Sequence, residues 1–370
     1  MTPVERDYCL PDSSGFQSDH DKRNGGGYSA LNSSGPMLNR HKVVMVFALF
    51  AGLPWILAGE SARENPVSPP TAYYAMCDAS AGVAIGEELF AVANDEDNAI
   101  RVYRVGRGEG PIDSFDFSTF LKVDPKWPET DLEGAAWLDD RIFWIGSHGR
   151  NRDGKFRASR DRFFATKVEK TAQGARLVPA GKPYGRLLED LIADRQLKSF
   201  RLSAASKLPP KDRGALNIEG LCATPDKHLL VGFRNPIPHG RALLVPLLNP
   251  NDVVSGTPAK FGAPILLNLG GKGIRDIGFW HGKYLIVAGS YDAQGVSEVY
   301  LWKGGSAEPQ RMPGIDLHGF NPEAVIVHPK NRLSFQLLSD DGTMMVDGTP
   351  CKRLPDPKQR NFRSVWVTPP

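Results

Sequence analysis

Pairs of short apolar runs recur along the chain, and an acidic residue opens each pair. The clearest pair is the stretch 131–148, D-L-E-G-A-A-W-L-D-D-R-I-F-W-I-G-S-H, in which Glu133 lies thirteen residues before Gly146. The same offset recurs twice, from Glu219 to Gly232 and from Asp276 to Gly289. Looser copies begin at Asp78 and at Glu323. We therefore count five copies of one repeat.

Each copy consists of two apolar runs separated by a turn, which is typical of two antiparallel strands joined by a hairpin. The turns have suitable residues, at 138–140, 224–227, 281–282 and 328–331. Further strand candidates follow the pairs, at 99–105, 162–168, 242–247 and 299–302. Repeats of about four strands each, without sustained helical periodicity, predict an all-β fold, a β-propeller. We expect five blades and keep six as the alternative.

One interval between copies is longer than the others. Glu133 and Glu219 are 86 residues apart, whereas the next two intervals are 57 and 47 residues. The excess contains the stretch 187–199, L-L-E-D-L-I-A-D-R-Q-L-K-S, whose apolar residues are spaced as on one side of a helix. We expect a helical insertion between two blades; a degenerate sixth blade is the alternative.

The N-terminal part of the chain differs from the rest in composition. Residues 1–36 are polar and rich in Gly, Ser and Asn, so we expect a disordered leader, a gene-model extension ahead of a true start at Met37. Residues 37–62 have a cationic start and an apolar run from Val43 to Ala58, as in a secretory signal peptide. A linker at 63–71 and a single propeller domain at 72–370 would follow. We expect export to the periplasm or the medium; an N-terminal membrane anchor is the alternative.

Charge and cysteine content exclude several classes of protein. The formal net charge is only +3, and no basic block is present, so we expect no nucleic-acid partner. After the leader, Cys77, Cys222 and Cys351 form a sparse set without C-x-x-C spacing. This set predicts neither a disulfide framework nor a zinc site. We expect the mature protein to be a monomer without a membrane span.

Blade geometry predicts where the acids meet. The innermost strand of a blade starts on the face to which the second strand returns, so the opening acids should ring one mouth of the central channel. Their ring comprises Glu133, Glu219, Asp276 and Glu323, with Ser80 in the fifth place. Carboxylates gathered in this way stay ionised when a cation binds, and oxygen ligands suit Ca²⁺ or Mg²⁺. These four acids are our candidate metal ligands. Alternatively, each acid holds neighbouring blades together through backbone N–H groups or an adjacent arginine.

Basic and polar residues that follow the second strands should surround this ring. His148 is a candidate general base or metal ligand, and Arg150, Arg234 and Arg275 suit a phosphate or carboxylate group. No P-loop, Rossmann or other motif for an organic cofactor is present. Two functions fit: a metal-dependent hydrolase of phosphate or ester bonds, with His148, Arg150 and Arg234 as catalytic candidates, or a non-catalytic propeller. The second would bind a small anionic ligand or a protein partner on the same face.

Four motifs in order carry a resemblance to a known family: D-L-E-G…G-S-H, N-I-E-G-L…G-F-R-N-P, R-D-I-G and N-P-E-A…L-S-D-D-G. They resemble a bacterial family of commonly exported proteins, classed as a domain of unknown function, over about residues 75–345. This resemblance implies propeller-like repeats and brings no established reaction. The E-G at the start of a strand is also similar to phytase-like and lactonase-like propeller hydrolases, in which acids at the channel hold a metal.

Overall fold

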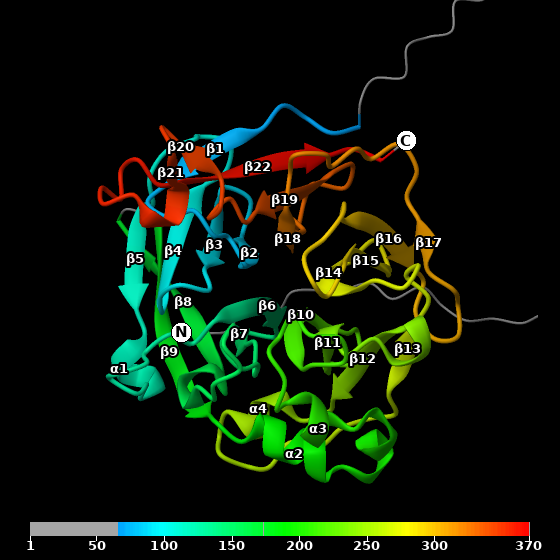
Figure 1. Cartoon of the computed structure of the whole chain (residues 1–370). Helices are drawn as coiled ribbons and strands as arrows, with labels where there is room; N and C mark the ends of the chain where they lie inside the picture. Colours follow the sequence, from blue (N-terminus) through cyan, green and yellow to red (C-terminus); the bar gives the residue numbers. More distant parts are fainter. Residues whose placement is uncertain (1–65, 173, 370) are drawn as a thin grey trace, which may run out of the picture. The chain divides into compact units, whose positions relative to one another are not determined.

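The computed structural model describes residues 66–172 and 174–369, and most of their regular structure is β-strand. Five four-stranded antiparallel sheets are arranged around a common centre (Figure 1). The chain is therefore an all-β protein, a five-bladed β-propeller, as the repeat pattern predicts. The predicted leader and signal peptide lie outside the described residues.

The strands of each blade follow from the innermost to the outermost. Blade 1 contains β2 (Ala81–Ile85), β3 (Leu89–Ala93), β4 (Ala99–Arg104) and β5 (Asp113–Asp116). Blade 2 contains β6 (Leu132–Leu138), β7 (Arg141–Gly146), β8 (Phe163–Thr171) and β9 (Gly174–Tyr184). Blade 3 contains β10 (Asn217–Ala223), β11 (Leu229–Asn235), β12 (Ala242–Leu247) and β13 (Ile265–Leu267).

The last two blades complete the ring. Blade 4 contains β14 (Gly273–Trp280), β15 (Lys283–Gly289), β16 (Glu298–Trp302) and β17 (Gln310–Arg311). Blade 5 contains β18 (Pro322–Ile326), β19 (Phe335–Ser339), β22 (Asn361–Val367) and β1 (Thr71–Tyr74). A small hairpin, β20 (Met345–Val346) and β21 (Thr349–Pro350), lies between β19 and β22 in the chain.

Strand β1 closes the ring, because the start of the described chain supplies the outer strand of the last blade. It pairs antiparallel with β22, with Thr71 opposite Ser364. Figure 1 shows β1 (blue) and β22 (red) side by side. Tyr73 on β1 is buried, stacks on Phe362 and packs edge-on against Phe90 of blade 1. Because the chain continues from β1 into β2 of blade 1, the pairing of β1 with β22 holds blades 5 and 1 together.

The hydrophobic core is divided into layers, one between each pair of adjacent blades. Since both faces of most blades are covered, their second strands are apolar almost throughout; every residue of β11 is buried. The continuous apolar runs in the sequence therefore reflect burial on two sides rather than on one.

A helical insertion follows blade 2, as the sequence predicts. It comprises α2 (Leu187–Ala193), the 3-10 helix η2 (Arg195–Phe200) and α3 (Leu202–Ala205). Leu187, Leu191 and Leu197 are buried in the core layer between blades 2 and 3. The long interval in the sequence is thus an insertion and not a sixth blade. None of the helices in the described part of the chain is long and apolar enough to cross a membrane.

The inner strands of blades 2 to 5 share one irregularity near their start. Each has a β-bulge, which places one residue out of the ladder. The bulged residues are Glu133, Glu219, Arg275 and Glu323. The expectation that Asp276 is equivalent to the glutamates is therefore wrong by one residue. Gly146 pairs with the residue before its bulge, Gly232 with the residue after its bulge and Gly289 with the second residue before its bulge, so equal offsets in sequence do not mark equal places in space.

The glycine after the bulge explains the E-G motif. A Cβ on Gly134 would lie 3.0 Å from Leu221 of the next blade, and one on Gly220 would lie 2.8 Å from Ile274. The inner strands of blades 2, 3 and 4 approach so closely that a side chain at this position would collide with the neighbouring blade. The motif is thus a requirement of blade packing.

A disulfide joins Cys77 to Cys351, 274 residues apart. The expectation that the cysteines form no disulfide is therefore wrong. The two residues are distant in sequence, and only the ring closure brings the start of blade 1 beside the segment after β21. Cys222 is the free, buried thiol among the described residues.

Candidate functional site

A charged pocket of about 670 Å³ lies at the end of the channel where the inner strands begin. We call it the mouth pocket. Its acidic lining residues are Asp95, Glu96, Glu129, Asp131, Glu133, Glu219, Glu323 and Asp340. Its basic lining residues are Arg152, Arg160, Lys211, Arg234, Arg275, Lys352 and Arg353. Asn217 and Asn321 also line it, so the predicted gathering of inner-strand acids and neighbouring polar groups at one mouth is present.

Two arginines neutralise two of the predicted metal ligands. Arg234 Nη1 lies 2.6 Å from Glu219 Oε1, and both side chains are buried. Arg275 pairs with Glu323 and places its Nε 3.7 Å from Glu219 Oε2. Its Nη1 also donates to Asn321 Oδ1 at 2.5 Å. Arg275 therefore links the inner strands of blades 3, 4 and 5, and this pairing is the cohesive role that formed our alternative for the acids.

A third arginine pairs with acids that precede β6. Arg160 Nη1 lies 2.8 Å from Asp131 Oδ2, and Arg160 also pairs with Glu129. Burial raises the pKa of Asp131 to about 6, although the Arg160 charge opposes this shift. This side of the mouth pocket thus has one arginine for two carboxylates.

Glu133 differs from the other bulged glutamates because it has no hydrogen bond or ion pair to any described residue. It is only 8% exposed and lines the mouth pocket. Burial and the nearby charges of Glu219, Asp131 and Asp95 raise the pKa of Glu133 well above its ordinary value. A buried carboxyl with a raised pKa and free oxygens is a candidate general acid or base.

Four acids from blades 1 and 5 form what we call the acid cluster: Asp78, Asp95, Glu96 and Asp340. Carboxylate oxygens of the first three lie within 4.8 Å of one another. Burial, followed by the charge of Asp340 and a hydrogen bond with it, raises the pKa of Asp78 to about 8. Burial and surrounding carboxylates also raise the pKa of Asp95. Lys352 Nζ lies 2.5 Å from Glu96 Oε1 at the exposed edge.

Three predicted site residues lie outside the mouth pocket. The carboxylate of Asp276 accepts hydrogen bonds from the backbone N–H groups of Ile277, at 2.8 Å, and Val325, at 2.7 Å. It therefore joins blade 4 to blade 5. Arg150 donates from Nε to the Ser206 carbonyl at 2.8 Å and from Nη1 to the Gly154 carbonyl at 3.0 Å, which ties loops together.

His148 is also placed elsewhere. It is buried, and its Nδ1 lies 2.8 Å from the Gly146 carbonyl oxygen. Because a carbonyl only accepts, Nδ1 carries the proton in this contact. Burial lowers the pKa of His148 to about 4, so the ring is neutral at physiological pH. Among the three predicted catalytic residues, the structure brings Arg234 alone to the mouth pocket.

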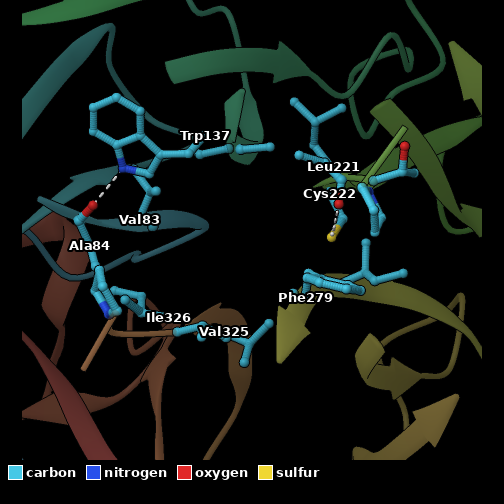
Figure 2. Close-up of a pocket in the computed structure, with 18 of the residues that line it drawn as sticks. Val83, Ala84, Trp137, Leu221, Cys222, Phe279, Val325 and Ile326 are labelled. Atoms are coloured by element: carbon cyan, nitrogen blue, oxygen red, sulfur yellow. Dashed lines mark hydrogen bonds between the residues drawn. The ribbon is translucent and has the colours of Figure 1, made fainter. Parts of the chain in front are cut away.

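A second pocket, of about 550 Å³, occupies the opposite end of the channel, at the hairpin turns. Figure 2 shows its lining, which includes Val83, Leu221, Val325 and Phe279 from four different blades. Trp137 donates from its indole nitrogen to the Ala84 carbonyl at 2.6 Å, so the polar atom of this side chain is engaged. The two ends of the channel thus differ in character, one charged and one apolar.

Sequence reasoning missed several members of the charged site, among them Glu129, Arg160, Glu96 and Lys352. Glu96 and Lys352 received no role, although Glu96 follows Asp95 in the polar stretch N-D-E-D after β3. Lys352 follows Cys351, and the disulfide to Cys77 joins its segment to the one that carries Asp78. The position of Glu96 beside Asp95 is visible in the sequence, whereas the position of Lys352 near Asp78 is not.

Fold and pocket together define a five-bladed β-propeller with a charged pocket at one end of its channel. Within this class, the chain belongs to the family described as "Protein of unknown function (DUF3616)", whose model matches residues 78–173 and 156–316. No curated protein matches the chain.

Several solved structures are similar to this chain at low identity. A glutaminyl cyclase from Myxococcus xanthus is 10% identical, with a TM-score of 0.40, over 82% of this chain and 96% of that one. A glucose-dehydrogenase-type oxidoreductase from Thermus thermophilus is 10% identical, with a TM-score of 0.38, over 81% and 100%. A Trypanosoma rangeli sialidase is 12% identical, with a TM-score of 0.37, over 71% and 44%. These similarities say nothing about the chemistry of this chain.

Proposed function

We propose that the chain is an exported hydrolase of phosphate or ester bonds, which acts on a small anionic ligand in the mouth pocket with the help of a divalent cation. The observation that carries the proposal is Glu133, a buried carboxyl without a partner that lines this pocket. Structural carboxylates in the same ring have partners, as Glu219 and Glu323 do. An unpaired buried acid costs stability, and such a cost is typical of functional sites.

The arginines support an anionic ligand. Arg234 Nη2 is buried and has no hydrogen-bond partner, although Nη1 is engaged by Glu219. Arg275 Nε likewise lacks a hydrogen bond. Both side chains line the mouth pocket, so each keeps donor capacity toward a phosphate or carboxylate oxygen. The glutamates that pair with them fix their orientation.

Hydrolysis then assigns one role to each group. The carboxylate of Glu133 takes a proton from a water molecule, whose oxygen attacks the phosphorus or the carbonyl carbon. The bond from that atom to the leaving oxygen breaks, and the leaving oxygen receives the proton from Glu133. Arg234 and Arg275 stabilise the negative charge that develops on the remaining oxygens. A divalent cation would polarise the same group and lower the pKa of the water.

The experiment is a turnover assay on a panel of p-nitrophenyl phosphate, bis-p-nitrophenyl phosphate and simple lactones, with Ca²⁺, with Mg²⁺ and with chelator. We expect turnover that requires the metal. Glu133→Gln should lower kcat about 100-fold or more with little change in KM, the range for loss of a general base. Asp140→Asn is the matched control, because Asp140 is exposed at a hairpin turn at the far end of the channel.

The second candidate is a non-catalytic propeller that binds an anion or a protein partner at the same pocket. It is favoured by the pairing of Arg160, Arg234 and Arg275 with carboxylates, since these pairs also serve blade cohesion. Absence of turnover on the whole panel, together with ligand binding that Arg234→Gln abolishes, would support this function over hydrolysis.

Export is supported by the disulfide, because such bonds persist in oxidising compartments and are rare in the cytosol. Cell fractionation and N-terminal sequencing of the mature chain test it. We expect the protein outside the cytoplasm with an N-terminus between Ala58 and Ala62. Recovery of residues 1–36 on the exported protein would contradict the predicted start at Met37.

A further inference from the structure

We infer that the acid cluster, Asp78, Asp95, Glu96 and Asp340, binds one divalent cation, Ca²⁺ or Mg²⁺, in the wall of the mouth pocket. This inference deepens the proposed function. It rests on that function only where it gives the cation a role in hydrolysis. It replaces the ring of four acids predicted from the sequence, in which Glu219, Glu323 and Asp276 have protein partners.

The spacing of the oxygens suits a hard cation. Carboxylate oxygens of Asp78, Asp95 and Glu96 lie within 4.8 Å of one another. Two ligands on opposite sides of a Ca²⁺ ion are at most about 4.6–5.2 Å apart, because each lies about 2.3–2.6 Å from the ion. A single ion could therefore reach all three oxygens with small side-chain adjustments, and oxygen-only ligands favour Ca²⁺ or Mg²⁺ over softer metals.

Unpartnered oxygens in the cluster and beside it also point to a ligand. Within the cluster, Asp95 Oδ1 is buried and has no hydrogen bond to any residue that the structure describes. Glu133, more than nine-tenths buried and without a partner, lines the same pocket and is near enough for the Asp95 charge to raise its pKa. Native proteins leave few buried polar atoms unsatisfied, so these oxygens require an explanation. A bound cation or its water ligands would satisfy both.

The protein scaffold fixes the members of the cluster from several directions. Asp78 follows the disulfide residue Cys77, and its carboxylate lies so close to Gly342 that a Cβ there would be 1.6 Å from Asp78 Oδ1. The Gly342 N–H donates to Asp340 Oδ1 at 2.9 Å, and Asn321 Nδ2 donates to Asp340 Oδ2 at 3.2 Å. The glycine at 342 is thus needed to leave room for the Asp78 carboxylate.

Lys352 is the basic side chain that lies against this cluster. Its Nζ contacts Glu96. The Lys352 side chain is only partly buried, so the ammonium group can move into solvent. It supplies one positive charge to several carboxylates. Burial lowers the pKa of Lys352, but the hydrogen bond and the charge of Glu96, followed by the charges of Asp78 and Asp95, raise it above its ordinary value. We therefore expect Lys352 to compete with the cation for Glu96, which makes its removal informative.

The experiment is isothermal titration calorimetry of chelator-treated protein with CaCl₂ and with MgCl₂, together with melting curves. We expect one bound ion and a rise in melting temperature with cation concentration. Asp95→Asn should weaken binding at least tenfold, whereas the Asp140→Asn control should bind as the wild type does. Lys352→Met should bind the cation more tightly, since it removes the competing charge.

The Lys352 variant keeps the inference falsifiable if Asp95→Asn fails to fold. No heat of binding and no shift in melting temperature with either ion, in the wild type and in Lys352→Met, would overturn the inference. Cation binding without turnover on any ester or phosphate would leave the site in place and contradict the hydrolase. Cation binding together with turnover that is indifferent to chelator would leave the site in place and contradict the role of the cation in hydrolysis.

Discussion

Glu133 and Glu219 occupy the same bulge position in neighbouring blades, yet they differ in their surroundings. Glu219 has Arg234 at 2.6 Å and Asn217 Nδ2 at 2.7 Å from the same oxygen. Glu133 has neither kind of partner. The difference follows from Arg234, which lies on β11 of blade 3 and reaches the glutamate of its own blade. Equivalent residues thus divide into one that stabilises the fold and one that is available for chemistry.

The raised pKa of Glu133 makes stability depend on pH. Between the ordinary glutamate pKa and the raised native value, the native state binds a proton that the unfolded chain has released, so native stability falls as pH rises through this window. Glu133→Gln removes this pH-dependent loss of stability, because glutamine does not titrate. In chelator, we expect its melting temperature to exceed that of the wild type near neutral pH and the gain to shrink toward about pH 4, near the ordinary glutamate pKa. Calorimetry across this range measures it; a gain independent of pH would contradict the assignment.

Glu219→Gln is the matched substitution and should act in the opposite direction. It would leave Arg234 buried beside an uncharged amide, and breaking a buried ion pair in this way costs about 3–5 kcal/mol. We expect this loss in urea unfolding with and without added Ca²⁺. A loss confined to metal-loaded protein would instead make Glu219 a cation ligand.

Asp276→Asn tests the cohesive role of the residue that the sequence placed in the metal ring. The carboxylate accepts from two backbone N–H groups, and an amide would turn one oxygen into a donor facing an N–H. We expect a loss of about 1–3 kcal/mol in the free energy of unfolding, the cost of an unsatisfied buried donor. Calorimetric titration with cation should give the same affinity as the wild type.

At the scale of elements, the ring depends on strand β1, which pairs with β22 through few residues. Tyr73 anchors this strand between Phe362 and Phe90, and its hydroxyl accepts from the Gly106 N–H at 2.8 Å. Since β1 belongs to blade 5 and its aromatic side chain packs on blade 1, one residue stabilises two blades. The contacts that hold blade 5 to blade 1 therefore depend on the short strand β1.

A pair of substitutions separates packing from hydrogen bonding in this closure. Tyr73→Ala should cost about 3–5 kcal/mol, as for other buried aromatic side chains. Tyr73→Phe keeps the packing and should cost about 1 kcal/mol, for the lost hydrogen bond. Urea unfolding of both variants measures the difference. Equal losses would mean that the aromatic packing contributes little to closure.

At the scale of the whole molecule, the disulfide adds a covalent closure beside the non-covalent one. It joins the start of blade 1 to the segment between β21 and β22 of blade 5. The residue after each cysteine, Asp78 or Lys352, belongs to the wall of the acid cluster. The Cys77–Cys351 disulfide therefore contributes both to ring closure and to the position of the charged residues next to it.

Removing this bond should affect both properties. We expect Cys77→Ser with Cys351→Ser to lose about 2–5 kcal/mol of stability, as for native disulfides in general, and to bind cation more weakly. Wild-type protein in reductant should behave in the same way, while the double variant should be indifferent to reductant. Unchanged cation affinity in the double variant would show that the strands alone position Asp78.

The sequence by itself favoured five blades over six and predicted the hairpins and the helical insertion. These features depend on local signals: apolar runs, turn residues and helical spacing over 187–199. It also located the charged mouth, since blade geometry brings the starts of inner strands together. The glycine of the E-G motif is visible in the sequence of both blade 2 and blade 3, because the inner strand of each blade packs closely against that of the next blade.

Only the tertiary structure decided which charges are free. The bulge of blade 4 falls at Arg275, so Arg275 rather than Asp276 takes the place of the glutamates. Pairing depends on distances between blades, which left Glu133 without a partner and neutralised Glu219 and Glu323. The disulfide and the acid cluster join residues from the two ends of the propeller. Such contacts follow from ring closure, and no local pattern in the sequence encodes the distances that decide them.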